Sequence, residues 1–295
     1  MKHPYTRALF KASTHRVVMP DVIASGTLLS VDSVFRTYSL PRNGILGSRP
    51  NFNALDNVDF HIGHGERVGL VGESGCGKST LTRAILGVED VQSGQITLDG
   101  EPVFSGNKPN LDVRRKMQVV FQDPYSSFNP RHRVDRLIAE PLHVLENPPV
   151  GKLKDLAILK ALEDVGLMGS DAKKFIHEFS GGQRQRIAIA RALIIEPELI
   201  IFDEAVSALD VSVRAQVLDL ISELCQQRSL AYLFISHDLS VVRSVTDRVM
   251  IMRAGKIVEH GETEKVFTNP QNAYTKTLIA AAPRLPEAIY AIEPV

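Results

Sequence analysis

A glycine-rich loop between an apolar segment and a helix-forming segment constrains this chain more than any other feature. Residues 72–79 read Gly-Glu-Ser-Gly-Cys-Gly-Lys-Ser; they follow the apolar segment Arg67–Val71 and lead into Lys78–Val88, a predicted helix that ends near Gly87. The spacing G-x-x-x-x-G-K-[ST] between a strand and a helix is typical of loops that hold phosphate groups. A glycine-rich turn with a chance lysine is the alternative, and the two flanking segments argue against it. We therefore predict a nucleoside triphosphate site at this loop.

The residues of the loop have separate expected roles. Its glycines let backbone N–H groups turn inward around phosphates, and the N-terminal end of the following helix adds a positive dipole. Lys78 is expected to reach the β- and γ-phosphates, and Ser79 to offer its hydroxyl to Mg²⁺. The expected phosphate-binding residues are Gly72, Ser74, Gly75, Gly77, Lys78, Ser79 and Thr80.

A second apolar segment, Leu199–Phe202, ends in the two acids Asp203 and Glu204. A buried strand that carries Asp203 to its carboxyl end suits Mg²⁺ coordination, and Glu204 is placed to orient or deprotonate an attacking water. Acids at strand ends can also serve only to increase solubility, so this pair supports a Mg²⁺ site only together with the phosphate loop.

Composition limits the remaining function classes. The chain has 295 residues with 34 basic and 34 acidic side chains, so its zero net charge gives no electrostatic reason to expect nucleic acid or an acidic membrane as a partner. Its two cysteines, Cys76 and Cys225, are too few for a disulfide framework or a metal cluster and favour a reducing compartment. No run approaches the ~20 apolar residues of a membrane-spanning helix, and no secretory signal is evident, so we expect a protein that is soluble by itself.

The hydrophobic pattern alternates between predicted strands and helices, which implies a largely parallel sheet covered on both faces. An extension (1–26), an exposed loop (Pro41–Asn53) and a C-terminal tail (284–295) are expected to flank or interrupt a domain over 27–283. From about 130 to 180 the pattern turns helical, which predicts an inserted helical subdomain. The predicted strands are 28–34, 58–62, 67–71, 95–98, 118–121, 198–203 and 231–235, and the later helices are 182–194, 211–227 and 239–245, followed by a hairpin at 254–255.

The segment Phe179-Ser-Gly-Gly-Gln183 resembles the signature motif of ABC ATPases, with Phe in place of the commoner Leu. In that family the corresponding turn closes over ATP held by the opposite subunit, which assigns nucleotide contacts to Ser180, Gly181, Gly182 and Gln183. A serine N-cap for the helix 182–194 is the simpler interpretation, but it leaves the two glycines and the glutamine unexplained.

Other family motifs follow in order from Leu28 to about Pro283. Gln122 resembles the Q-loop glutamine, which contacts Mg²⁺ and couples to the membrane partner. Asp210, in Ser207-Ala-Leu-Asp210, resembles the D-loop residue at the dimer interface, and His237 resembles the switch histidine that contacts the γ-phosphate. Tyr38 lies where the family stacks an aromatic ring on adenine, although a lone tyrosine on an early strand is more often a packing residue.

The resemblance implies an α/β fold, a P-loop NTPase core of mostly parallel sheet with an N-terminal antiparallel β subdomain and the inserted helical subdomain. It also implies an ATPase that binds ATP and Mg²⁺, with Glu204, His237, Gln122 and Lys78 as catalytic residues. The implied Mg²⁺ contacts come from Ser79, Gln122 and Asp203.

Three further segments resemble the oligopeptide/dipeptide/nickel uptake subfamily, namely Phe121–Pro130, Asp203–Ser212 and Asn269–Leu278. The implied function is ATP-driven import of di- or oligopeptides, with uptake of nickel or another small solute as the alternative. The implied partners are a second ATPase subunit, identical or homologous, two membrane permeases and an extracytoplasmic substrate-binding protein, with the chain peripheral on the cytoplasmic face of the inner membrane. No cysteine follows Cys225, so we expect no iron–sulfur cluster.

Two rivals belong to other classes. A soluble ABC ATPase that acts on ribosomes or DNA generally carries two cassettes or long coiled-coil inserts, and neither is evident. A cassette that binds ATP without hydrolysis needs a degraded site, whereas Lys78, Ser79, Asp203, Glu204 and His237 are all present.

The first residues resemble the last. His3-Pro-Tyr-Thr-Arg-Ala-Leu-Phe10 is similar to Asn272–Ile279, a motif that the family carries at the C-terminal end of an ATPase. Residues 1–20 are interpreted as a remnant of an upstream ATPase in a tandem protein, and an unrelated short extension is the alternative.

Overall fold

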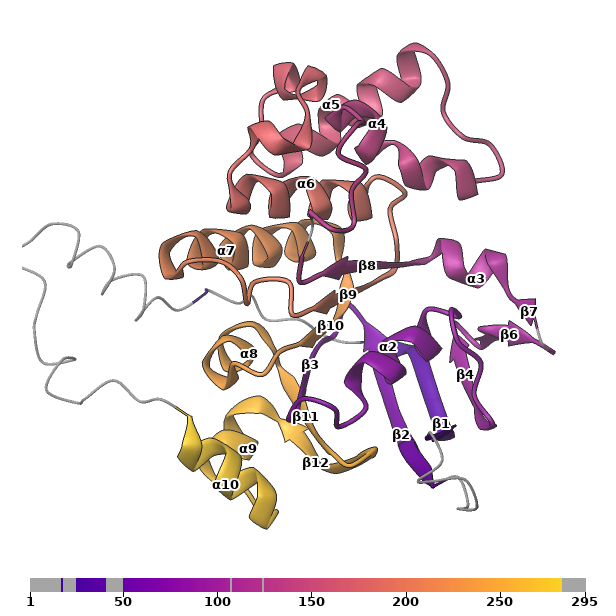
Figure 1. Cartoon of the computed structure of the whole chain (residues 1–295), viewed down its shortest axis with the longest axis vertical. Coiled ribbons are helices and arrows are strands. Elements are labelled where there is room, and N and C mark those ends of the chain that lie inside the picture. Colours follow the sequence, from indigo (N-terminus) through magenta and orange to yellow (C-terminus); the bar gives the residue numbers. More distant parts are fainter. Residues whose placement is uncertain (1–16, 18–24, 41–49, 107, 124, 283–295) are drawn as a thin grey trace, which may run out of the picture.

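The computed structural model describes residues 17, 25–40, 50–106, 108–123 and 125–282 (Figure 1). The repeat at His3–Phe10, the tail from 284 and most of the predicted loop at 41–53 lie outside these residues.

A six-stranded sheet forms the centre of the fold, with strand order β12-β11-β3-β10-β9-β8. The five strands from β11 to β8 run parallel, and β12 joins the edge as an antiparallel partner of β11. The predicted parallel sheet is therefore confirmed. The strands are β3 (Arg67–Val71), β8 (Met117–Phe121), β9 (Leu199–Asp203), β10 (Ala231–Ile235), β11 (Arg248–Arg253) and β12 (Lys256–Glu262).

Alternate residues of the central strands enter two different hydrophobic cores. Ile200 and Phe202 on β9 belong to one core, whereas Leu199 and Ile201 belong to the other. Because successive strand side chains point to opposite faces, the sheet separates the two cores and is buried on both sides. One core contains side chains of α6 (Gly181–Leu193), α7 (Val211–Arg228) and α8 (Leu239–Val245); the other contains side chains of α2 (Lys78–Ile85).

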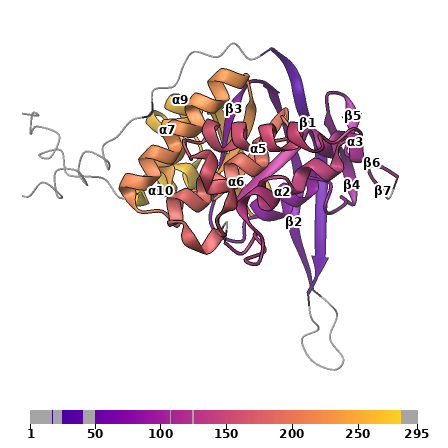
Figure 2. The same ribbon diagram turned by 90° about the horizontal axis from the view of Figure 1, so that it is seen from above.

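An antiparallel sheet of order β2-β1-β4-β5 shares the core of α2. Seen from above, its long strands lie to one side of the helices that cover the parallel sheet (Figure 2). The predicted loop at 41–53 extends too far, because Asn51–Asn53 already pair with β1. The strands are β1 (Ser25–Ser39), β2 (Asn51–His64), β4 (Ser93–Leu98) and β5 (Glu101–Pro102), followed by the small β6 (Phe104–Ser105) and β7 (Lys108–Pro109) ribbon.

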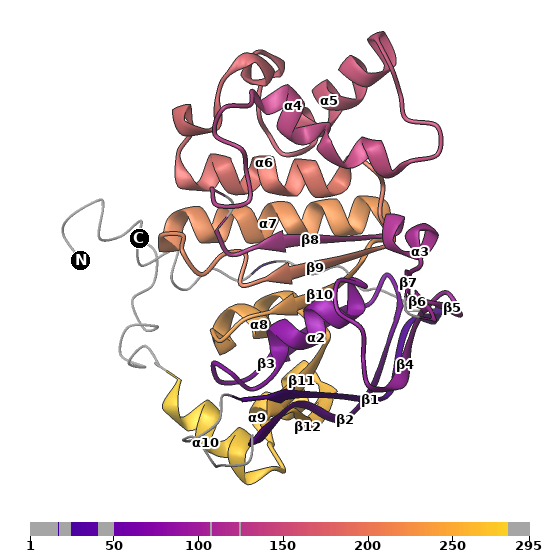
Figure 3. The same ribbon diagram turned by 45° about the vertical axis from the view of Figure 1, so that its right-hand side comes forward.

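Short helices gather beyond α6, at the end of the molecule opposite β12 (Figures 1 and 3). They contribute to the same core as α6, through Leu137, Ile138, Ile158 and Leu162. These elements are α4 (Val134–Ile138), η1 (Glu140–Val144), α5 (Lys152–Asp164), η2 (Gly169–Lys173) and η3 (Ile176–Glu178).

The remaining helices are α3 (Leu111–Arg115) before β8, and α9 (Thr263–Thr268) and α10 (Ala273–Ala281) after β12. Over the described part of the chain, no helix has the length and apolar character needed to cross a membrane. The predicted fold class is confirmed, a mostly parallel α/β core with an antiparallel β part and a helical part.

Candidate nucleotide-binding site

The phosphate loop joins the carboxyl end of the buried strand β3 to the first turn of α2. Gly75 and Gly77 have φ angles of 79° and 117°, a region that side-chain-bearing residues rarely adopt. A Cβ on Gly77 would lie 2.2 Å from the carbonyl oxygen of Ala54, and one on Gly72 would lie 2.3 Å from that of Met252. The glycines are therefore required both by the turn and by the close approach of neighbouring backbone.

Lys78 is buried at the inner side of this loop. Its Nζ donates to the carbonyl oxygen of Gly72 at 2.6 Å and to that of Glu73 at 2.9 Å. These bonds hold the ammonium against the loop. A phosphate oxygen would compete with the two carbonyls for the same donor, with the advantage of a full negative charge.

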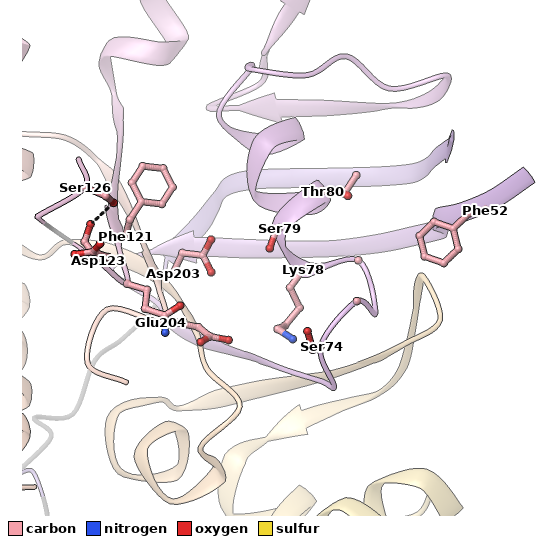
Figure 4. Close-up of a pocket in the computed structure, with 13 residues that line it drawn as sticks. Phe52, Ser74, Lys78, Ser79, Thr80, Phe121, Asp123, Ser126, Asp203 and Glu204 are labelled. Carbon is pink, nitrogen blue, oxygen red and sulfur yellow. Dashed lines mark hydrogen bonds between the residues drawn. The ribbon is translucent and has the colours of Figure 1, made fainter. Parts of the chain in front are cut away.

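The loop forms one wall of a pocket of about 600 Å³. Figure 4 shows Ser74, Lys78, Ser79 and Thr80 on one side and Asp203, Glu204 and Asp123 on the other. Of the predicted site residues, the pocket brings together Ser74, Gly75, Gly77, Lys78, Ser79, Thr80, Gln122, Asp203 and Glu204.

The acidic wall comes from the end of β9. Burial raises the pKa of Asp203, and the nearby Glu204 acts in the same direction, while Lys78 and Arg83 oppose the change. Glu204 has a left-handed backbone with φ of 51°, a strained conformation of the kind found at functional sites. Its N–H donates to the carbonyl of Ile235, the last residue of β10, at 2.9 Å.

His237 lies beside the acidic wall, although it does not line the pocket itself. Its Nδ1 is 3.3 Å from Oε1 of Glu204, and the His237 side chain is exposed. The imidazole follows β10, the neighbour of β9 in the sheet, so two adjacent parallel strands deliver the pair to one edge.

The donor set of the pocket fits a Mg²⁺ ion. The Ser79 hydroxyl, the Gln122 amide and the Asp203 carboxylate line the same cavity and all offer oxygen ligands. The half-buried Asp203 carboxylate, whose pKa is raised by burial, has the most to gain from a divalent cation. When bound, Mg²⁺ would neutralise charge on the phosphates.

Tyr38, the predicted adenine partner, lies outside the pocket lining. Its hydroxyl donates to Oε1 of Glu89 at 2.7 Å, and the Arg36 guanidinium lies 5.1 Å from its ring centroid. Phe52 faces Tyr38 across the β1–β2 ladder and does line the pocket. Phe52 lies within the predicted loop 41–53, and a β2 strand pattern extended back to Asn51 would include it.

The signature turn also lies outside the pocket lining. Ser180, Gly181 and Gln183 are exposed, and Ser180 caps α6 with its Oγ 3.4 Å from the N–H of Gln183. Gln183 completes a capping box by accepting from the Ser180 N–H at 3.0 Å. The expected serine cap and the signature motif are thus both compatible with this one turn.

The starts of α6 and α7 lie close together at Gly182, next to the cap residue Asp210. A Cβ on Gly182 would lie 2.2 Å from Cγ1 of Val213, so α6 can approach α7 only with glycine there. Asp210 caps α7 by accepting from the N–H of Val213 at 3.0 Å; this bond and a second from Ser212 lower the pKa of Asp210. The signature turn and Asp210 therefore belong to one exposed edge.

Two arginines of α6 hold the segment that follows Gln122. The Arg191 guanidinium lies 4.6 Å from the Phe128 ring centroid and donates to the carbonyl of Ser127 at 3.0 Å. Arg184 lies 5.1 Å from the ring centroid of Tyr125. The sequence motifs did not predict this link between the signature helix and the Gln122 segment.

This arrangement of a phosphate loop, a half-buried aspartate at a strand end and a glutamate–histidine pair is that of a phosphate-loop ATPase. A family model described as ABC transporter matches residues 55–207, and a model for the oligopeptide/dipeptide transporter C-terminal region matches 258–293. The chain belongs to the ABC transporter family, and the resemblance inferred from its motifs is confirmed.

Relatives and solved structures agree with that assignment. The dipeptide transport ATP-binding protein DppF of Haemophilus influenzae is 44% identical over 251 residues, which are 85% of this chain and 76% of that protein. The oligopeptide transport ATP-binding protein OppF of Bacillus subtilis is 47% identical over 244 residues, 82% of this chain and 80% of that protein. The dimeric post-hydrolysis structure of the ATP-binding cassette MJ0796 with ADP and Pi superimposes with a TM-score of 0.69 at 26% identity, covering 80% of this chain and 99% of that one.

Proposed function

We propose that this chain is the ATP-hydrolysing subunit of an importer for di- or oligopeptides. The peptide assignment is supported by the match of residues 258–293 to the peptide-transporter C-terminal region and by the relatives named for dipeptide and oligopeptide transport. The proposed ATPase domain spans 27–283, with the helical subdomain at about 130–180. The chain would work at the cytoplasmic face of the inner membrane, without entering the bilayer.

The proposed mechanism, in which two subunits share each ATP site, rests on one observation. The chain has a phosphate-loop pocket and an exposed signature turn, and the residues of the turn are not among those that line the pocket. A second ATPase subunit, a copy or a homologue, would supply Ser180–Gln183 to the pocket and receive the same turn in return. Two ATP molecules would then be enclosed at two equivalent interfaces.

Within the enclosed site, the residues of this chain have distinct roles. Lys78 and the loop N–H groups hold the phosphates, while Ser79, Gln122 and Asp203 would hold Mg²⁺. Glu204 accepts a proton from the attacking water, and the adjacent His237 contacts the γ-phosphate and orients Glu204. Phe52 is the aromatic side chain that we assign to the adenine end, because it lines the pocket whereas Tyr38 is bonded to Glu89.

The permease partners are supported by a groove next to the Gln122 strand, lined by apolar side chains together with the polar or charged Arg114, Arg115, Gln118 and His143. The groove holds about 550 Å³ between the turn after α2, α3, β8 and η1, and its rim exposes Val88 and Leu111, each 61% accessible. Exposed apolar patches of this kind mark protein contacts. A permease helix lodged here would touch β8, which ends directly before Gln122, and so connect permease motion to the nucleotide site.

The test of the proposed function is Glu204→Gln, which keeps the shape of the side chain and removes the base. We expect MgATP affinity within about twofold of wild type, a stable ATP-dependent dimer by light scattering, and turnover reduced by about 1000-fold. Glu223→Gln on the exposed face of α7 is the matched control and should behave as wild type. Near-normal turnover in Glu204→Gln would show that Glu204 is not the base that accepts the proton from water. Uptake of labelled peptide, with Ni²⁺ as the competing cargo, tests the substrate class.

A further inference from the structure

The outer side of the phosphate loop is held by elements from the C-terminal end of the chain. The N–H of Glu73 donates to the Tyr274 hydroxyl at 3.3 Å, a bond between residues 201 positions apart. The N–H of Gly255, in the β11–β12 turn, donates to the carbonyl of Cys76 at 2.8 Å. The loop is thus bonded on one side to a hairpin and to α10, which lies next to that hairpin (Figure 1).

The start of α10 is fixed by Glu259 on β12. Its carboxylate accepts from the N–H of Gln271 at 2.7 Å and from that of Asn272 at 3.1 Å. Burial acts to raise the pKa of Glu259, but these hydrogen bonds outweigh it and leave the pKa lowered. Asn272 then caps α10 by accepting from the N–H of Tyr274 at 2.9 Å.

The side chain of Tyr274 is held in place by its surroundings. The side chain is only 8% exposed, and the guanidinium of Arg253 lies 4.7 Å from the ring centroid. Burial also raises the pKa of Tyr274, so the hydroxyl stays neutral near pH 7. A rigid neutral hydroxyl at the end of a held ring is suited to fix one backbone group.

We propose that Tyr274 is a positioning residue for ATP binding, and that the C-terminal motif Asn269–Leu278 serves to hold it against the phosphate loop. By fixing the N–H of Glu73, the hydroxyl restrains the loop at its first turn, before the glycines that face the pocket. Preorganised N–H groups bind phosphate better than mobile ones, so the state of α10 sets the affinity of the loop. This inference rests on the proposed role of the loop in binding ATP.

The test is Tyr274→Phe in the full chain, because this change removes the hydroxyl and keeps the ring under Arg253. Loss of one hydrogen bond predicts a Kd and a KM for MgATP raised about fivefold, with kcat within about twofold. Hydrogen exchange in the segment 70–80 should be faster without nucleotide. Thr277→Val, which removes an exposed hydroxyl from the same helix, should match wild type in all three measurements.

A second variant guards against a folding defect. Glu259→Gln weakens the anchor of α10 without touching Tyr274 and should raise KM about twofold in the same direction. An unchanged KM in Tyr274→Phe, or an equal shift in Thr277→Val, would overturn the inference. So would a lower melting temperature with KM unaltered, since it would make Tyr274 a packing residue. Lys78→Ala, measured in parallel, separates the two proposals: if it binds MgATP normally, the proposed site itself is wrong.

Discussion

Two helices of this chain begin at a glycine-rich turn, and their first turns are completed in different ways. α2 starts at Gly77 in a left-handed conformation, and within the described residues no side chain caps it. α6 starts at Ser180, with a capping box formed by Ser180 and Gln183. The first helix directs its N–H groups toward a pocket, whereas the second has the N–H groups of Ser180 and Gln183 paired within its own turn.

The two turns also differ in how far their residues are buried. The phosphate loop is partly buried, since Gly72, Gly77 and Lys78 are buried while Glu73–Gly75 are exposed. Of the signature turn, Ser180, Gly181 and Gln183 are exposed and only Gly182 is buried. An uncapped helix end next to buried Lys78 is built for an anion. A capped and exposed turn is stable alone and is available to another subunit. The comparison supports the proposal that one chain holds a phosphate-binding half and a closing half of two different sites.

The largest effect is expected from Lys78→Ala in the enclosed turn. Removing the buried ammonium should weaken MgATP binding by about 100-fold, the loss typical of a charge-assisted contact. Isothermal titration calorimetry measures this directly. Lys116→Ala, which removes a half-exposed ammonium paired with Asp99 and Glu198, is the control and should bind normally. A loss below threefold for Lys78→Ala would place the phosphates elsewhere.

A change in the exposed turn should separate binding from turnover. A Cβ on Gly181 would lie 3.9 Å from Leu209, so Gly181→Asp fits sterically and only adds a negative charge. Like-charge repulsion with the partner-held ATP should lower turnover about 100-fold while MgATP affinity of the isolated subunit stays within twofold. Gly181→Ala adds a methyl group without charge and should lower turnover about tenfold. A parallel loss of affinity in Gly181→Asp would mean that the turn serves its own pocket.

The smallest effect concerns stability. Ser180→Ala removes the cap of α6 and should cost about 1 kcal/mol, a drop in melting temperature of a few degrees by calorimetry. Ser74→Ala in the phosphate loop is the matched control, because α2 carries no side-chain cap in the described structure. Equal drops for the two serines would contradict the contrast between the turns.

The sequence predicted the parts of the site that depend on local spacing. The strand, glycine loop and helix at 67–88 can be predicted from residues that are neighbours in the chain, and so can the acids at the end of β9. The structure brings these parts to one pocket. Two features could not be predicted in this way. Phe52 lies in a polar, exposed stretch that reads as a loop until β1 pairs with it, and Tyr274 meets Glu73 only through the tertiary fold.

The central claim, that each pocket is completed by the other subunit, is tested most directly by mixing two inactive variants. Lys78→Ala has a defective phosphate loop with an intact signature turn, and Gly181→Asp has the reverse. In a mixed dimer, one interface combines the intact loop with the intact turn, so an equimolar mixture should recover about a quarter of wild-type ATP turnover. Where the second subunit is a homologue, one dimer carries the two changes on opposite subunits. It is compared with a dimer that carries both changes on the same subunit. Activity no higher than that of the separate variants would contradict a site shared between subunits.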